Sequence, residues 1–514
     1  MADVFKTPGV YVQEISKFPP SVAQVETAIP AFIGYTEKAE LPDGTFLGDT
    51  PLRITSELEY STFFGGAPEQ TGIVVQLDLK ETAPTPIKAH IGTIGADAGG
   101  NPVINAGTPS AYRMAHAVRM YYANGGGPCY IVSVGSYADA INVDAMGTGN
   151  AGDPAAAPPV PPVLGGLTAI RKIDEVTLLL FPDADGLGAT NYYDLYEKAL
   201  TQCAELQDRF TIIDVKQAFA RDLANGIATA IDAMRNELTS DFLNYGAAYW
   251  PYLNTTLTYR HNQDTSVTFF KPGDADYHAK TLKDLKDADA AAQANPPAGG
   301  PPKKLVNNKF LADVNNIINQ FPVIMPPSSA IAGIYARTDS TRGVWKAPAN
   351  TGVTLVREPA VKINFEDQMD MNVHTTGKSV NAIRSFIGKG TLVWGARTLD
   401  GNSNEWRYVP VRRLFIMVEE SVKKATERFV FEPNDANTWS KVRAMIENFL
   451  TLQWRSGALA GPTPESAFYV RVGLNETMTA LDILEGRMIV EIGMAAVRPA
   501  EFIILRFSHK MQEA

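Results

Sequence analysis

The chain has 514 residues, of which 45% are hydrophobic and 20% are charged, a composition typical of folded proteins that excludes wholesale disorder. The length excludes a single small module and predicts about two to four domains, at roughly 100 to 200 residues each. Basic residues number 46 against 56 acidic ones, a formal net charge of −10, so nucleic acid and acidic lipid surfaces are poor default partners.

The first element in the chain is an isolated strand. Residues 8–15 alternate around β-branched and aromatic side chains, and the proline pair at 19–20 separates them from the next element. We interpret residues 1–22 as an extended N-terminal arm. A short apolar strand at 29–36 and a helix at 56–64, ended by Gly65-Gly66, come next.

A helix, a glycine turn and a buried strand are expected between residues 108 and 134. Thr108 is suited to cap the helix, Pro109 to occupy its first position, and Gly125-Gly126-Gly127 to end it. Residues 142–166 are rich in Gly, Ala and Pro, which predicts a linker or an exposed loop and a domain boundary near 165.

The middle region, 166–395, alternates strands and helices and therefore predicts an α/β sheet with parallel strands. Its expected strands and helices are Val176–Phe181, 192–206, Phe210–Val215, 223–236, Tyr245–Trp250 and a helix from Asn307 toward Phe321. Residues 253–305 are polar and break the pattern, so we interpret them as a surface excursion.

The C-terminal region, 396–497, carries the clearest helical periodicity. Apolar stripes predict a helix at 412–429 and a second one that opens after 433–435 and reaches 454. Strands are expected at 468–472 and 488–494 around a short helix at 479–484. The last segment, 498–514, contains a continuous apolar run at 501–508, which is typical of a strand covered on both faces.

Few residues carry a recognisable chemistry. The six histidines are scattered. Gly388-Lys389-Gly390-Thr391 lacks the first glycine of a phosphate loop, so we interpret it as a plain turn. Residues 183–186 lack the remaining ligands of a calcium loop, so we interpret them as a strand-to-helix turn. A nucleophilic serine near Ser328 stays open, although no Gly-x-Ser-x-Gly elbow supports it. We therefore predict no catalytic residue, no metal and no cofactor.

The two cysteines, Cys129 and Cys203, are too few for a disulfide scaffold and are not spaced as a metal knuckle. We interpret them as buried thiols. The chain starts without a signal-peptide pattern and has no run of about 18 apolar residues. We therefore expect synthesis in the cytoplasm, with no direct membrane insertion.

Seven blocks are spread from the first ten residues to the last fifteen: 7–15 (TPGVYVQEI), 31–36 (AFIGYT), 124–127 (NGGG), 326–333 (PPSSAIAG), 394–398 (WGART), 430–435 (VFEPND) and 499–502 (PAEF). Together, and in this order, they resemble the contractile tail sheath family. The family comprises sheaths of contractile phage tails, phage-tail-like bacteriocins and extracellular contractile injection systems.

The resemblance implies a mixed α/β fold: a multi-domain subunit with an N-terminal α/β part at 23–165, a subtilisin-like middle region that is not a protease, a C-terminal α+β domain and arms at both ends. The loops near 84–107, 142–166 and 253–305 depart from the family pattern. The resemblance therefore does not predict which parts of the chain decorate the outer surface of the sheath.

In this family both arms add strands to sheets of neighbouring subunits, with backbone hydrogen bonds supplying continuity and alternate side chains fixing register. The N-terminal donors would be Val10, Tyr11, Val12 and Glu14. The C-terminal donors would be Phe502, Ile503, Ile504, Leu505 and Phe507. The alternative is that both strands pair within their own chain.

The resemblance implies a structural subunit stacked as six-fold rings around an inner tube, which contracts from a metastable extended state to drive the tube through a target envelope. Its partners would be further copies, the inner tube protein, the baseplate and terminal cap proteins. Glu419, Lys423 and Lys424 are candidates for the inner-tube contact, although a solvated helix face explains them equally. The rival functions are a non-contractile, capsid-like shell and a hydrolase on the middle region.

Overall fold

The computed structural model describes residues 22–80, 85–152, 163–217, 226–294 and 304–506. They fold as two compact units. The large unit takes its residues from 26–416 and 498–506, and the small unit from 22–25 and 417–497. The chain therefore leaves the large unit near Ile416 and returns to it at Arg498.

A nine-stranded sheet lies at the centre of the large unit, with the strand order β13-β16-β15-β9-β8-β7-β1-β6-β2. The strands from β15 to β6 pair in parallel, whereas β2, β16 and β13 are antiparallel to their neighbours. Their bounds are β1 Pro30–Thr36, β2 Leu52–Ile54, β6 Cys129–Ser136, β7 Leu178–Leu180, β8 Phe210–Asp214, β9 Gly246–Trp250, β13 Thr351–Gly352, β15 Val380–Phe386 and β16 Gly390–Val393.

The four parallel strands β1, β7, β8 and β9 are buried along their whole length because helices cover the sheet. The helices and the short 3-10 turn of this layer are α1 Glu57–Phe64, α2 Met114–Ala123, α3 Val143–Met146, α4 Gly166–Ile170, η1 Pro182–Gly186, α5 Ala189–Leu206, α6 Gly226–Glu237, α9 Ser328–Arg342 and α10 Phe365–Asn372. The α/β fold expected from the alternation of strands and helices is confirmed.

The predicted start of α2 is wrong. Thr108 and Pro109 precede the helix, which begins at Met114 after Arg113. The helix is instead capped from a distant part of the chain, because the backbone N–H groups of Arg113 and Met114 donate to the carboxylate of Asp183. A local capping pattern cannot reveal such a partner. The turn after α2 is as expected, with Gly125 at φ 100°, a conformation that favours glycine.

A second sheet of the large unit has the order β11-β3-β4-β5 and its own apolar core, which includes Phe269 and Phe310. Its strands are β3 Ile73–Leu77, β4 Pro86–Ala96, β5 Pro102–Ala106 and β11 Val267–Phe270, accompanied by α7 Leu282–Ala294 and α8 Asn308–Gln320. The loop expected near 84–107 is therefore mostly the hairpin β4–β5. A three-stranded sheet, β12-β10-β14, has the bounds β10 Leu253–Thr255, β12 Ile324–Met325 and β14 Val356–Pro359.

The small unit contains most of the helices and strands expected for the C-terminal region. The helix α11 spans Val409–Thr426 and enters the unit from the large one, and the other elements are α12 Ala436–Arg455, α13 Pro464–Ala467, β17 Phe468–Arg471, α14 Ala480–Leu484 and β18 Glu491–Met494. The apolar stripe of α12, which includes Val442, Ile446 and Leu450, is buried as the periodicity indicates.

Candidate functional site: the arms and the surfaces beside them

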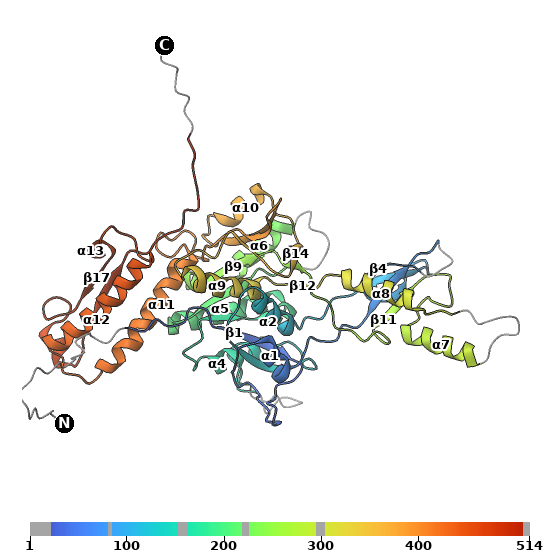
Figure 1. Cartoon of the computed structure of the whole chain (residues 1–514), viewed down its shortest axis with the longest axis horizontal. Coiled ribbons are helices and arrows are strands. Elements are labelled where there is room, and N and C mark those ends of the chain that lie inside the picture. Colours follow the sequence, from blue (N-terminus) through green and yellow to red (C-terminus); the bar gives the residue numbers. More distant parts are fainter. Residues whose placement is uncertain (1–21, 81–84, 153–162, 218–225, 295–303, 507–514) are drawn as a thin grey trace, which may run out of the picture. The chain divides into compact units, whose positions relative to one another are not determined.

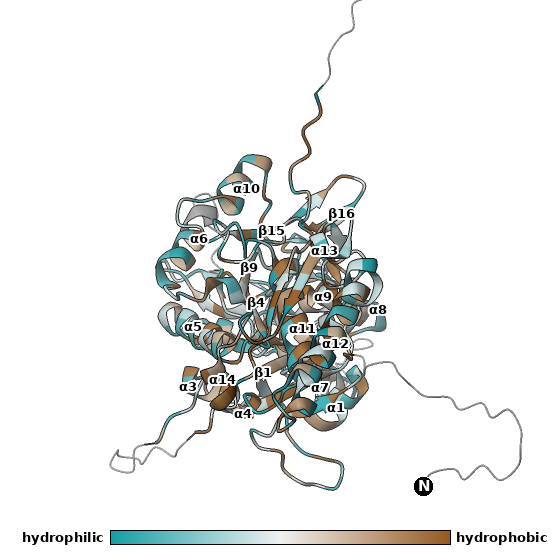
Figure 2. Cartoon of the chain, turned by 90° about the vertical axis from the view of Figure 1, so that its left-hand side faces the viewer, coloured by the Kyte–Doolittle hydropathy of each residue, from teal (hydrophilic) through white to brown (hydrophobic). Residues whose placement is uncertain are grey.

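The C-terminal segment begins at a firmly held residue and continues into exposed ones. The Glu501 carboxylate accepts hydrogen bonds from Arg397, Asn372 and Tyr408 of the large unit. Directly after it, Phe502, Ile503, Ile504 and Leu505 have 68%, 79%, 78% and 71% of their surface exposed. These four residues belong to no helix or strand. In Figure 2 much of this C-terminal segment has the colour of hydrophobic residues.

Four consecutive exposed apolar side chains are costly in water, at about 25 cal/mol per Å² of apolar surface. A segment of this kind is also an aggregation hazard in a monomer. Residues 502–505 of the predicted C-terminal donor thus pair with no strand in the described part of their own chain, although continuous apolarity favours a covered strand. Phe507, the last of the predicted donors, lies outside the described residues.

The predicted N-terminal donors Val10, Tyr11, Val12 and Glu14 also lie outside the described residues. The described chain starts at Val22, and its first contacts belong to the small unit. The side-chain amide of Gln453 donates to Gln24 over 3.1 Å, and the backbone N–H of Val25 donates to Ser421 Oγ over 3.1 Å.

The strands β17 and β18 form a sheet of only two strands among the described residues. They pair antiparallel from Phe468 opposite Met494 to Arg471 opposite Glu491. Beyond β18, the bridge between Leu459 and Ala496 extends the pairing. A two-stranded sheet is marginal by itself and has edges that can accept a further strand.

The predicted tube-contact residues lie on the last turns of α11. The side chains of Lys423 and Lys424 reach Glu420 Oε atoms at 3.1 and 3.3 Å. Lys423 is 64% exposed, Lys424 is 38% exposed and Glu419 also faces solvent, whereas Glu420 is only 9% exposed. The structure therefore brings both lysines onto one buried carboxylate, a pairing that their spacing of three and four residues permits.

A separate cluster of buried polar groups lies at the carboxyl ends of β7 and β8. Asp185 receives the guanidinium of Arg113 at 3.0 Å and the hydroxyl of Tyr252 at 2.9 Å. The ammonium of Lys216 donates to the backbone carbonyls of Asp185 and Leu187 at 2.8 and 2.7 Å. The residues 183–186 form η1 between β7 and α5, so the predicted strand-to-helix turn is confirmed.

Ser328, which the sequence analysis kept as a candidate nucleophile, contacts Asp214 at the carboxyl end of β8. Its backbone N–H donates to Asp214 Oδ1 over 2.7 Å, at the start of α9. Ser328 and Asp214 each have only 1% of their surface exposed. Burial raises the pKa of Asp214 to about 7, although the hydrogen bonds of Ser328 favour the ionised carboxylate. The contact therefore holds α9 against β8 inside the protein.

Replacing Asp214 by Asn is expected to change how stability depends on pH. The raised pKa means that the folded chain keeps a proton between about pH 4 and pH 7 that the unfolded chain has released, so this group makes stability fall as pH rises. The Asp214→Asn variant has no carboxyl group here and therefore does not lose this stability as pH rises. Its stability relative to the parent chain should be greater at pH 8 than at pH 5, by about 2 to 3 kcal/mol.

Urea unfolding at the two pH values measures this difference. Asp194→Asn on α5 is the control, since this side chain is 45% exposed and forms a surface ion pair with Lys198. An Asp214→Asn variant with the same pH dependence as the parent chain would contradict the assignment.

Among the described residues no group of three or more His, Cys, Asp or Glu side chains is arranged to hold a metal ion. No helix in the described part of the chain is both long enough and apolar enough to span a bilayer.

Residues 402–510 match the family model described as the phage tail sheath C-terminal domain. The tail sheath protein of Enterobacteria phage T4 is 27% identical over 146 residues, which are 28% of this chain and 21% of that protein. The tail sheath protein of Burkholderia phage BcepMu is 28% identical over 141 residues, 26% of this chain and 29% of that protein. The chain thus spans less than a third of the length of each of these curated relatives.

Solved structures match along nearly the whole chain. The contracted sheath of the extracellular contractile injection system PVC is 27% identical with a TM-score of 0.59, and 99% of each chain is covered. The contracted helical sheath of the anti-feeding prophage is 29% identical with a TM-score of 0.59, over 99% of this chain and 100% of the other. A chain of the six-fold symmetrised anti-feeding prophage baseplate is 29% identical with a TM-score of 0.58, over the same shares.

The sequence resemblance, the C-terminal family model and these full-length structural matches agree with one another. Residues 402–510 therefore match the phage tail sheath C-terminal domain, and the chain as a whole is similar to the subunits of contractile sheaths.

Proposed function

We propose that this chain is the structural subunit of a contractile sheath that polymerises around an inner tube and drives the tube outward when it shortens. The observation that carries the proposal is the match over 99% of the chain to two sheaths solved in the contracted state. A structural role, without catalysis, agrees with the names of the curated relatives, which are tail sheath proteins.

Contraction of such a lattice needs no nucleotide if the extended form is a higher-energy state that is set during assembly and held by a kinetic barrier. A release of only about 1 to 3 kcal/mol per subunit, the size of a modest coupling energy, sums to a large work output over a long lattice. Head-to-tail contacts that do not close on themselves generate the helical tube, and stacked six-fold rings are the expected form.

Strand donation would keep the subunits tethered while they rotate. The exposed apolar residues Phe502 to Leu505 support this role for the C-terminal arm, because a second copy offers them a partner that their own chain does not. The edges of the β17–β18 sheet, which pair with no further strand among the described residues, are a candidate acceptor in the neighbouring copy. Val10 to Val12 remain the proposed N-terminal donors.

We propose the exposed charges Glu419, Lys423 and Lys424 of α11 as part of the contact with the inner tube. Substituting both lysines by Glu should weaken assembly on the tube, with the greatest effect at low salt, because the contact is electrostatic. Lys441→Glu on α12 is a matched control, since this lysine is also exposed in the small unit. Co-sedimentation with the tube protein measures assembly, and unchanged extended particles would contradict the contact.

The baseplate and terminal cap proteins are the other proposed partners, and one matched structure is itself a baseplate assembly. We propose that the subunit assembles in the bacterial cytoplasm and then forms part of a phage tail or of an extracellular particle.

Negative-stain electron microscopy of the protein, alone and with its tube partner, tests the proposal. Wide striated tubes from the protein alone and narrower ones with the tube partner are expected for a sheath with a metastable extended state. Closed particles would instead favour a capsid-like shell, and dispersed monomers in both samples would contradict the proposal. Labelling of a serine by an activity-based probe would favour a hydrolase, although Ser328 and Ser329 are only 1% and 2% exposed.

A further inference from the structure

Two sequence blocks that lie about a hundred residues apart meet in the large unit. Arg397, which comes shortly after β16, holds Glu501, the last residue before the exposed arm. Its Nε lies 2.9 Å from Glu501 Oε1 and its Nη2 lies 2.6 Å from Oε2. This is a bidentate ion pair, the geometry in which arginine binds a carboxylate most strongly.

Further donors complete the binding of the same carboxylate. Asn372, the last residue of α10, donates from its side-chain amide to Oε1 over 2.7 Å, and the Tyr408 hydroxyl donates to Oε2 over 3.1 Å. Arg397 is 5% exposed and Glu501 is 20% exposed. Burial alone would raise the pKa of Glu501, but Arg397 and the other donors lower it below its ordinary value.

Arg397 is itself held in place from the neighbouring strand. Its backbone N–H donates to Asn381 Oδ1 over 2.8 Å, and the Asn381 side-chain amide donates back to the Arg397 carbonyl over 2.8 Å. Asn381 lies on β15 of the central sheet and is 1% exposed. The guanidinium therefore projects from a rigid part of the fold.

The arm has no comparable contact among the described residues after Glu501, and the nearest fixed point before it belongs to the small unit. There the backbone N–H of Val497 donates to the carbonyl of Ala458 over 3.1 Å. If Glu501 were released, the free chain would begin near Arg498 and not at Phe502. The four additional residues would lengthen its reach by about 13 Å, at roughly 3.3 Å per residue.

We propose that Arg397, Asn372 and Tyr408 anchor Glu501, and thereby position the C-terminal arm so that residues 502–505 are presented to a neighbouring copy from a fixed point on the large unit. The proposal rests on the proposed sheath function. An arm that starts from a fixed point loses less conformational entropy when it binds and has a higher effective concentration at its acceptor. These are positioning residues that act through the arm.

A spin label on the arm tests the anchor in the monomer. The label is attached to Ile504→Cys, and it reacts selectively because Cys129 and Cys203 are buried. Burial also raises the pKa of the Cys129 thiol to about 12 and that of Cys203 in the same direction, which keeps both thiols protonated and unreactive.

Glu501→Gln should increase the mobility of the label and raise the critical concentration for tube formation by about tenfold, since preorganisation of the arm is lost. Tyr408→Phe removes only one hydrogen bond and should give a smaller change of both quantities in the same direction. This milder variant keeps the test valid if Glu501→Gln folds poorly.

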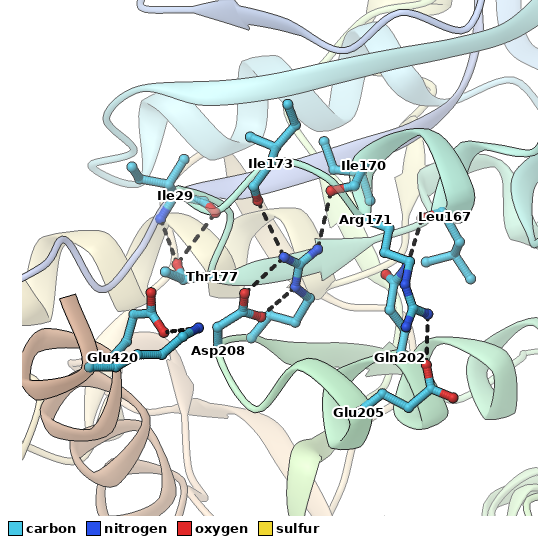
Figure 3. A network of polar contacts seen from close by, with 12 residues as sticks. Ile29, Leu167, Ile170, Arg171, Ile173, Thr177, Gln202, Glu205, Asp208 and Glu420 are labelled. Carbon is cyan, nitrogen blue, oxygen red and sulfur yellow. Dashed lines mark hydrogen bonds and ion pairs between the residues drawn. The ribbon is translucent and has the colours of Figure 1, made fainter. Parts of the chain in front are cut away.

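Asp208→Asn is the matched control. Asp208 forms a buried ion pair with Arg209, whose guanidinium also donates to the carbonyls of Ile170 and Ile173 (Figure 3). This change should lower the stability of the large unit and leave both the label mobility and the critical concentration unchanged. A general loss of stability is thereby separated from release of the arm.

Unchanged label mobility in Glu501→Gln would overturn the anchor. Increased mobility with an unchanged critical concentration would overturn its role in assembly. If the parent chain forms no tubes under any condition, the proposed sheath function fails, and the label mobility of the monomer still decides whether Arg397 and its neighbours anchor the arm.

Discussion

Removal of residues 502–514 is expected to leave a folded monomer that forms no stable tubes. The described part of this segment contributes little to its own chain, because Phe502 to Leu505 are 68% to 79% exposed. Its deletion should therefore change the unfolding midpoint of the monomer only slightly. The loss should appear in assembly, where the arm would supply both backbone hydrogen bonds and apolar burial to a neighbour.

Sedimentation and electron microscopy of the truncated protein measure the effect, with circular dichroism to show that the monomer is folded. A point variant makes the test sharper. Ile503→Asp should also prevent tube formation, whereas Phe365→Asp, at a similarly exposed apolar position of α10, should not. Normal tubes from the truncated protein or from Ile503→Asp would contradict donation by the C-terminal arm.

Deletion of residues 1–16 should have the same outcome for the N-terminal arm. The comparison of the two truncations separates the arms, because only the C-terminal one removes the segment after Glu501. A protein that forms tubes without residues 1–16 would refute strand donation by Val10, Tyr11 and Val12.

The sequence predicted those elements whose pattern is local. The stripe of α12 and the alternation of strands with helices around β8 depend on the periodicity of neighbouring side chains, so the sequence alone was enough to recognise them. The turn at Gly388 and Gly390, both at φ 76°, was equally recognisable, because glycine favours that conformation.

The sequence did not predict contacts between distant residues. Arg397 and Glu501 lie in separate blocks, and nothing in their spacing indicates that they pair. The same holds for Arg413, which meets Asp339 at 2.6 Å and the carbonyl of Thr27 at 2.7 Å. Paired buried charges of this kind have no local signature, since each partner alone is typical of a solvated surface.

Asp183 is the distant contact whose loss should cost most in stability. Its carboxylate is fully buried and accepts the backbone N–H groups of Tyr35 at 2.6 Å, Arg113 at 2.5 Å and Met114 at 3.1 Å. It thereby joins the end of β1 to the first turn of α2. A Cβ atom at Gly34 would collide with this carboxylate, so the close approach also requires the glycine.

Asp183→Ala is expected to destabilise the large unit by about 3 to 6 kcal/mol, since each buried N–H left without a partner costs about 1 to 3 kcal/mol. Asp183→Asn should cost less, because one oxygen is retained and can still accept from the helix. Asp194→Ala, which breaks a surface ion pair with Lys198, should cost about 1 kcal/mol or less.

Urea unfolding of the three variants, followed by tryptophan fluorescence, measures these differences, because Trp250 is buried in the same sheet. Burial raises the pKa of Asp183 to about 6, even though its three backbone donors favour the ionised form. The carboxylate is therefore mostly ionised at pH 8, and the comparison belongs there. An Asp183→Ala variant as stable as Asp194→Ala would show that α2 and β1 are held together by apolar packing alone and that the buried carboxylate is dispensable.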